Sequence, residues 1–204
     1  MNYTIWPARD DDLGTVMRLL HERVAWLRRR GSDQWSTHSR WLPEMEEALA
    51  RRRTWLLRDA RTCVPLGTVT LGTKGDPEFW TPAELGEPAV YLAKLATTPA
   101  YAGLGLGKLL LDFSLYFAAT RGFSTVRMDV WRTSTDLHAY YRSHGWSQLR
   151  TVDLPHRHSG TLFEKEVTSR DETGLPGELD ISPPGRRMTP APVILSELAR
   201  CHPR

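Results

Sequence analysis

The chain has 204 residues, of which 40% are hydrophobic and 25% are charged. This length and composition are typical of one folded domain, and they exclude both a wholly disordered chain and a pair of ordinary domains. The formal net charge of +3 is too small for a dedicated nucleic-acid-binding protein, and it fits an anionic small-molecule ligand better.

Signals for targeting and for metal binding are weak. No apolar run reaches the about 18 residues that a membrane span needs, and Asp10, Asp11 and Asp12 stand where a signal peptide would become apolar. We therefore expect a cytoplasmic protein without a membrane partner. Cys63 and Cys201 are too few for a disulfide framework, and the histidines lack the spacing of a ligand set, so we expect no metal.

The first part of the chain predicts one strand, two helices and two further strands. Apolar residues recur every three or four positions in the helical segments, and short β-rich runs mark the strands. In chain order, the segments are a strand at 3–7, a helix that follows Asp12 and ends at Gly31, a helix from Pro43 through Leu49, and an antiparallel pair of strands at 54–58 and 66–71.

The second part predicts alternating strands and helices after a loop rich in proline and glycine at 73–88. In chain order, these are a strand at 89–97, a helix at 105–120, a strand at 125–131, a short helix at 135–143, and strands at 147–153 and 161–167. The order β-α-α-β-β-β-α-β-α-β-β belongs to the mixed α/β class. Six of the 14 prolines fall in 168–204, so we expect a folded domain at 1–167 and a proline-rich tail at 168–204.

A glycine-rich turn stands between the strand at 89–97 and the helix that follows it. Gly103, Gly105 and Gly107 let the backbone approach a ligand closely, and the free N–H groups of a helix start attract negative charge. The turn lacks the first glycine and the hydroxyl of a Walker A loop, and it lacks the third glycine of a dinucleotide fingerprint. A tight turn alone would explain one glycine and not three. The pattern therefore predicts a phosphate site of another type.

Two segments in register resemble one known family. Residues 95–110, LATTPAYAGLGLGKLL, look like the acetyl-CoA signature of the GNAT (GCN5-related) N-acetyltransferase superfamily, whose [QR]-x-x-G-x-[GA] pattern falls on 102–107. Residues 134–146, STDLHAYYRSHGW, resemble the family segment N-x-x-A-x-x-x-Y-x-x-x-G-F. Ala102 replaces the usual Arg or Gln, and Ser134 replaces the usual Asn. The agreement in element order extends the resemblance over 1–167.

The resemblance implies a splayed, mostly antiparallel central sheet and acetyl-CoA as the acyl donor. Its donor-binding positions are Leu95, Ala96, Thr97, Ala102, Gly103, Leu104, Gly105, Leu106, Gly107, Lys108, Ser134 and Tyr141. Tyr141 matches the family tyrosine that protonates the departing thiolate. Asp129 lies in the strand where some relatives carry a catalytic glutamate, and a salt-bridge role for it is equally open.

The resemblance implies a primary amine of a small molecule or a peptide as acceptor, and a homodimer is possible. Aromatic side chains near the expected acceptor region either line a pocket or fill a small core; they are Trp26, Trp35, Trp41, Phe79 and Trp80. Two other functions stay open, a transferase of the same fold that uses aminoacyl-tRNA as donor and a non-catalytic coenzyme A-binding domain. Nucleic acid is otherwise not expected as a partner.

Overall fold

The computed structural model describes residues 2–35, 41–169, 171 and 179–181. The helices are α1 (Leu13–Arg29), α2 (Trp41–Ala50), α3 (Pro82–Leu85), α4 (Leu106–Ala119) and α5 (Thr135–Ser143), with 3-10 turns at Asp10–Asp12 and Pro99–Tyr101. The strands are β1 (Tyr3–Pro7), β2 (Thr54–Asp59), β3 (Pro65–Gly72), β4 (Ala89–Thr97), β5 (Thr125–Trp131), β6 (Ser147–Thr151), β7 (Ser159–Glu166) and β8 (Leu179–Asp180).

The strands form one sheet in the order β6-β7-β5-β4-β3-β2-β1-β8. β4 runs parallel to β5 and β1 runs parallel to β8, while the other neighbouring strands are antiparallel. The prediction of a mixed α/β fold with a mostly antiparallel sheet is thus confirmed. Each predicted helix and strand is present, with ends that differ by a few residues.

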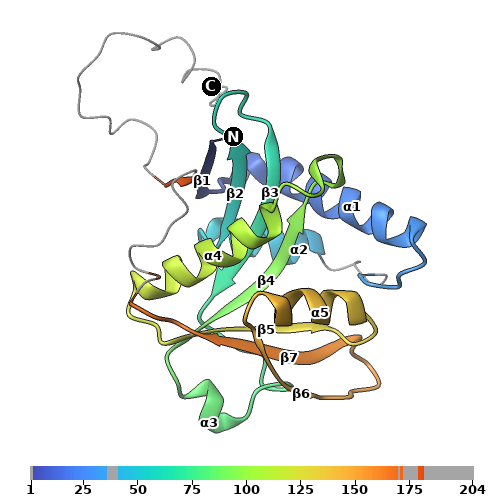
Figure 1. Cartoon of the computed structure of the whole chain (residues 1–204), viewed down its shortest axis with the longest axis vertical. Coiled ribbons are helices and arrows are strands. Elements are labelled where there is room, and N and C mark those ends of the chain that lie inside the picture. Colours follow the sequence, from blue (N-terminus) through green and yellow to red (C-terminus); the bar gives the residue numbers. More distant parts are fainter. Residues whose placement is uncertain (1, 36–40, 170, 172–178, 182–204) are drawn as a thin grey trace.

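Helices cover both faces of the sheet (Figure 1). α4 packs through Leu110, Phe113 and other residues into the larger core, which α5 joins through Tyr141. α1 and α2 pack into a second core on the opposite face, through side chains such as Leu20 and Met45. The apolar stripes that mark these helices in the sequence are the surfaces that they bury.

Helix α3 was not predicted, although the sequence contains its signal. The Thr81 hydroxyl accepts a hydrogen bond from the Glu84 N–H, and the Glu84 carboxylate accepts one from the Thr81 N–H, which is a capping box. The carboxylate also accepts two bonds from Arg150 at 2.6 and 2.7 Å. The Arg150 guanidinium is the main reason that the pKa of Glu84 falls to about 2. α3 therefore fastens the 73–88 loop to β6.

A short strand from the predicted tail returns to the sheet. In β8, Leu179 pairs with Tyr3 of β1 and is buried in the larger core. The rest of 168–204 is described only at residues 168, 169, 171 and 181, so the domain boundary near 167 stays a prediction. The sheet nevertheless has a strand beyond that boundary.

We expect Leu179→Ala to destabilise the fold measurably. Replacement of a buried leucine by alanine costs about 2 to 5 kcal/mol, and a site at the sheet edge can relax, so we expect the lower end. In a chain of this size, a loss of 1 kcal/mol lowers the melting temperature by about 2 to 4 °C. The matched control is Leu149→Ala in β6, where the side chain is 38% exposed. If both variants melt like the wild type, β8 contributes nothing to stability.

Candidate active site

A gap opens inside the sheet between β4 and β5. The two strands pair only where Ala89–Tyr91 faces Thr125–Arg127. Beyond this point β4 pairs only with β3, and β5 pairs only with β7. Figure 1 shows the two strands diverging toward their carboxyl ends. Among the described strands, the backbone N–H and C=O groups on the facing edges thus have no partner, and those that no side chain contacts are available to an extended ligand.

A bulge in β4 shapes one edge of this gap. Thr68 and Thr70 of β3 pair with Ala96 and Ala93, so β4 contains one residue more than β3 over this stretch. Lys94 has a φ of 52° in the bulge, and its ammonium pairs with Glu44 of α2 at 3.1 Å. A bulge changes the direction in which the following residues point. As a result, the part of β4 after the bulge can follow a different line from its neighbour β3.

The glycine-rich turn lies where β4 leads into α4. Gly103 and Gly105 have φ values of 86° and 70°, a region that side chains other than glycine rarely adopt. Gly105 is also the N-cap of α4 and is exposed. The first N–H groups of the helix have no acceptor within the helix, and they lie at the positive end of its dipole. This arrangement can bind a phosphate group.

The remaining residues of the turn contribute differently. Ala102 and Leu104 are exposed, whereas the side chain of Leu106 is buried in the core and leaves only its backbone for a ligand. A Cβ atom at Gly107 would lie 2.8 Å from the Tyr140 hydroxyl oxygen, so a larger residue would displace that tyrosine. The turn thus presents backbone rather than side chains.

Lys108 does not offer a free positive charge at the turn. Its ammonium pairs with Asp112, one helical turn further along α4. With Ala102 in place of the usual basic or amide residue, the amides of the turn are the main groups that face a ligand there.

Tyr141 lies on the buried face of α5, in the larger core. Its ring packs against Trp146 and Phe163, with centroids 6.3 and 5.5 Å away. Within the described part of the chain its hydroxyl makes no hydrogen bond. Burial, and to a smaller extent Tyr140, raises the pKa of Tyr141 above its ordinary value. The hydroxyl is therefore protonated at neutral pH and can donate a hydrogen bond.

Asp129 lies on the other face of β5. Val126, Met128 and Val130 alternate with it and face the larger core, so Asp129 points toward the side that α1 and α2 cover. Its side chain is exposed, yet the surrounding protein desolvates the carboxylate and raises its pKa, while a hydrogen bond from Ser159 acts in the opposite direction. Both facts fit a carboxylate that has protein on several sides and one side open to solvent.

Tyr141 and Asp129 are thus not in contact. They lie on opposite faces of the sheet beside the same gap, one carrying a proton and the other a carboxylate. Such a pair suits a reaction in which one reactant reaches the gap from the α1 face and the leaving group departs toward the α5 face.

The linker that follows α1 is tied to the end of β5. The Asp33 carboxylate accepts hydrogen bonds from the Trp131 indole N–H at 2.9 Å and from the Thr133 hydroxyl at 2.8 Å, and these bonds lower the pKa of Asp33. The Ser134 hydroxyl donates to Gln34 at 3.1 Å. Ser134, for which the family resemblance implies a place in the donor site, is therefore hydrogen-bonded to this linker.

At the end of β4, Arg23 of α1 contacts Thr97. Its Nε donates to the Thr97 carbonyl at 3.1 Å, and its guanidinium also donates to the Thr97 hydroxyl at 2.7 Å. Sequence reasoning did not single out Arg23, Asp33 or Trp131. Their importance arises from contacts between distant segments, for which the local pattern carries no signal.

The aromatic residues near this region divide into two groups. Trp41 is buried in the core of α1 and α2, and Phe79 and Trp80 form a third small core with Leu162 of β7. These three are therefore core residues. Trp26 is only partly buried, and the guanidinium groups of Arg23 and Arg30 lie over its ring.

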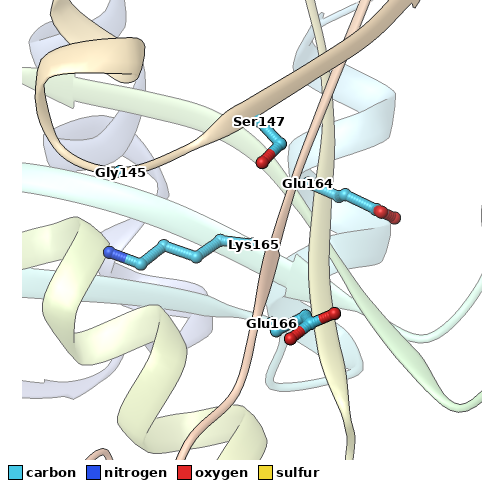
Figure 2. Close-up of a pocket in the computed structure, with 5 residues that line it drawn as sticks. All are labelled: Gly145, Ser147, Glu164, Lys165 and Glu166. Atoms are coloured by element: carbon cyan, nitrogen blue, oxygen red, sulfur yellow. The ribbon is translucent and has the colours of Figure 1, made fainter.

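A hollow of about 390 Å³ lies elsewhere, lined by Gly145, Ser147, Glu164, Lys165 and Glu166 (Figure 2). Lys165 pairs with Val126 near the start of β5, far from the carboxyl ends of β4 and β5. Its ammonium donates to the carbonyl of His144 and so caps α5. This hollow is separate from the gap in the sheet.

Within the described ranges, no three histidine, cysteine or acidic side chains gather in a way that could hold a metal ion. None of the helices described is both long and apolar enough to cross a membrane.

Comparison with known proteins identifies similar chains. The model of the acetyltransferase (GNAT) family matches residues 20–146. An uncharacterized N-acetyltransferase of Bacillus subtilis, YesJ, is 26% identical over 166 residues, which are 80% of this chain and 89% of YesJ. A GNAT-family acetyltransferase from Listeria monocytogenes has a similar structure, with a TM-score of 0.69, 18% identity, and coverage of 80% of this chain and 94% of that one. The PaiA N-acetyltransferase from Thermoplasma acidophilum, solved with coenzyme A, has a TM-score of 0.61 and 16% identity, and the match covers 81% and 99% of the two chains.

Proposed function

Because the chain belongs to the acetyltransferase (GNAT) family, we propose that it transfers an acetyl group from acetyl-CoA to a primary amine of a small molecule or peptide. The observation that carries the proposal is the gap between β4 and β5, which ends at a glycine turn with Gly103 and Gly105 at positive φ. The gap and the glycine turn together can bind an extended molecule that carries a phosphate group at one end.

In this proposal the two parts of the donor occupy two parts of the site. The pyrophosphate binds the N–H groups at the start of α4, together with the backbone of Ala102 to Lys108. The pantetheine arm lies along β4 and bonds to the backbone of Leu95, Ala96 and Thr97, as a further strand would. The thioester then lies inside the gap, between the faces that carry Asp129 and Tyr141.

The proposed reaction uses Asp129 as base and Tyr141 as acid. Asp129 takes a proton from the ammonium form of the acceptor, directly or through water, and the neutral nitrogen attacks the thioester carbon. The C–N bond forms, the C–S bond breaks, and the thiolate of coenzyme A takes a proton from the Tyr141 hydroxyl. The acylated nitrogen then loses its extra proton, which restores the Tyr141 hydroxyl through water, and Asp129 releases its proton to solvent. The products are an acetylated amine and free coenzyme A, and the atoms of both substrates are conserved.

A panel of ligands tests the proposal. Thermal unfolding is followed with acetyl-CoA, longer acyl-CoA thioesters, free coenzyme A and bulk tRNA, and an amine screen then follows release of the coenzyme A thiol. Stabilisation by acetyl-CoA together with amine-dependent thiol release supports the proposed function. Stabilisation by tRNA alone would favour the aminoacyl-tRNA alternative, and binding of coenzyme A without turnover of any amine would favour a binding domain.

We expect Asp129→Asn to lose activity and to gain stability. The folded protein raises the pKa of Asp129, so its charged form is disfavoured relative to the unfolded chain, and the stability present at low pH is lost as the pH rises through the folded-state pKa. Asparagine stays neutral and avoids this loss at pH 7 to 8. In the wild type, kcat/KM should fall as the pH drops through the raised pKa, because protonated Asp129 cannot accept a proton.

The control is Glu46→Gln, which removes an exposed carboxylate from α2. It should leave both the melting temperature and the activity near their wild-type values. If Asp129→Asn has the same kcat/KM as the wild type at pH 7 to 8, Asp129 is not the base.

A further inference from the structure

Arg23 is a partly buried arginine for which the described residues supply no carboxylate. Among the described residues its hydrogen bonds go only to the carbonyl and hydroxyl oxygens of Thr97, both of them neutral. The nearest acid in the sequence, Glu22, pairs instead with Arg18 and accepts a hydrogen bond from Thr98. Desolvation lowers the pKa of Arg23, as expected where a charge has left water without gaining an anionic partner.

The guanidinium lies beside the gap in the sheet. The Thr98 N–H donates to the Leu66 carbonyl of β3 at 2.8 Å. Successive residues of a strand direct their backbone groups to opposite sides, so the Thr97 carbonyl is directed away from β3 and toward the gap. Arg23 donates to that carbonyl, and its charge therefore lies next to the gap.

A second arginine reinforces this positive surface. The guanidinium carbons of Arg23 and Arg30 lie 4.9 and 4.3 Å from the centre of the Trp26 ring. These residues are three and four positions apart, so they share one face of α1. The aromatic ring holds both cations without neutralising them.

The positive surface is placed for the acceptor and not for the donor phosphates. The glycine turn begins α4, which packs on the face of the sheet opposite α1. Arg23 shares its face with Asp129, the exposed carboxylate that we propose takes the amine proton. One side of the gap thus offers a carboxylate for a cationic group and an unpaired guanidinium for an anionic one.

We propose that the acceptor is an amine that also carries a carboxylate, such as an amino acid or a short peptide, and that Arg23 binds this carboxylate. The inference rests on the proposed acetyltransfer and specifies its substrate class. The guanidinium fork matches a carboxylate in two parallel hydrogen bonds, which would replace the neutral contacts with Thr97.

The test uses pairs of acceptors that differ only in charge. The wild type and Arg23→Gln are assayed with free amino acids and dipeptides and with their C-terminal amides. We expect the wild type to prefer an acid over its amide by about 10- to 100-fold in kcat/KM, the range of a hydrogen bond to a charged group. Arg23→Gln should bring the acid-to-amide ratio of kcat/KM near one, mainly because KM for the acid rises. Arg23→Lys should restore part of the preference for the acid.

Arg28→Gln is the matched control, because Arg28 is an exposed arginine of the same helix. It should keep the wild-type ratio. Melting temperature and the shift with acetyl-CoA show whether each variant is folded and binds the donor. In a second experiment, the free acids should raise the melting temperature of the wild type with bound coenzyme A. They should not raise that of Arg23→Gln with bound coenzyme A.

The outcomes separate the two proposals. If the wild type acetylates acids and amides equally, the inference is wrong and the proposed function stands. If Arg23→Gln weakens acetyl-CoA binding and leaves the acid-to-amide ratio unchanged, Arg23 serves the donor and the inference is overturned. If no amine is acetylated but the acids still stabilise the complex through Arg23, the carboxylate site stands and the proposed function fails.

Discussion

Gly105→Glu should abolish the stabilisation of the protein by acetyl-CoA. The wild type at an acetyl-CoA concentration about 100 times its Kd gains about 2.7 kcal/mol, which raises the melting temperature by several degrees. The substitution places a negative charge at the N-cap of α4, where the donor phosphates would bind, and forces a side chain into a φ of 70°. Thermal unfolding with and without acetyl-CoA measures the effect.

Gly122→Glu separates loss of binding from backbone strain. Gly122 follows the other end of α4, has a φ of 74°, and has no atom within 4 Å of the position that a Cβ would occupy. Both substitutions should lower the melting temperature of the free protein by a similar amount. Only Gly105→Glu should lose the ligand-induced shift. An undiminished shift in Gly105→Glu would show that the phosphates bind elsewhere.

Tyr141→Phe should lower kcat about 100-fold while donor binding survives. General acid catalysis contributes about 10² to 10⁴ in rate, and the lower end applies here because the raised pKa of Tyr141 makes it a weak acid toward a thiolate. Phenylalanine keeps the packing against Trp146 and Phe163. If the defect is chemical, kcat and kcat/KM fall together and the Kd for acetyl-CoA stays nearly unchanged.

Tyr140→Phe is the neighbouring control. The Tyr140 hydroxyl lies close to Gly107 at the start of α4, whereas Tyr141 is on the buried face of α5, so loss of the Tyr140 hydroxyl should change kcat by only a few-fold. A Tyr141→Phe protein with full kcat at saturating substrates would show that the hydroxyl is not the acid. The reverse pattern, a large loss only in Tyr140→Phe, would place the acid one residue earlier.

The sequence predicted the parts of the fold that local periodicity controls. Helices such as α4 and the strands β4 and β5 follow from their apolar patterns, and the conformations of Gly103 and Gly105 explain why glycine occurs there. The capping box of α3 was present in the sequence and was overlooked. β8 could not be predicted, because two residues carry no periodicity and their pairing with β1 joins distant segments.

The candidate site was predicted less completely. The glycine turn, Tyr141 and Asp129 come from motifs and from a strand position, whereas the contact between Arg23 and Thr97 joins residues 74 positions apart. Such a contact depends on how α1 crosses the sheet, which no local pattern encodes. The same holds for the bonds of Asp33 to Trp131 and Thr133.

The gap between β4 and β5 also affects how donor affinity is distributed. In the proposed complex, the pantetheine arm would meet backbone groups that water can otherwise reach, so each hydrogen bond that it formed there would replace a bond to water. The net gain is only about 0.5 to 1.5 kcal/mol per bond. The strand edge is therefore better suited to fixing the register of the thioester than to supplying affinity. Most of the binding energy must come from the phosphates and from apolar contacts, and donors that share these groups but differ in acyl chain should bind with similar strength.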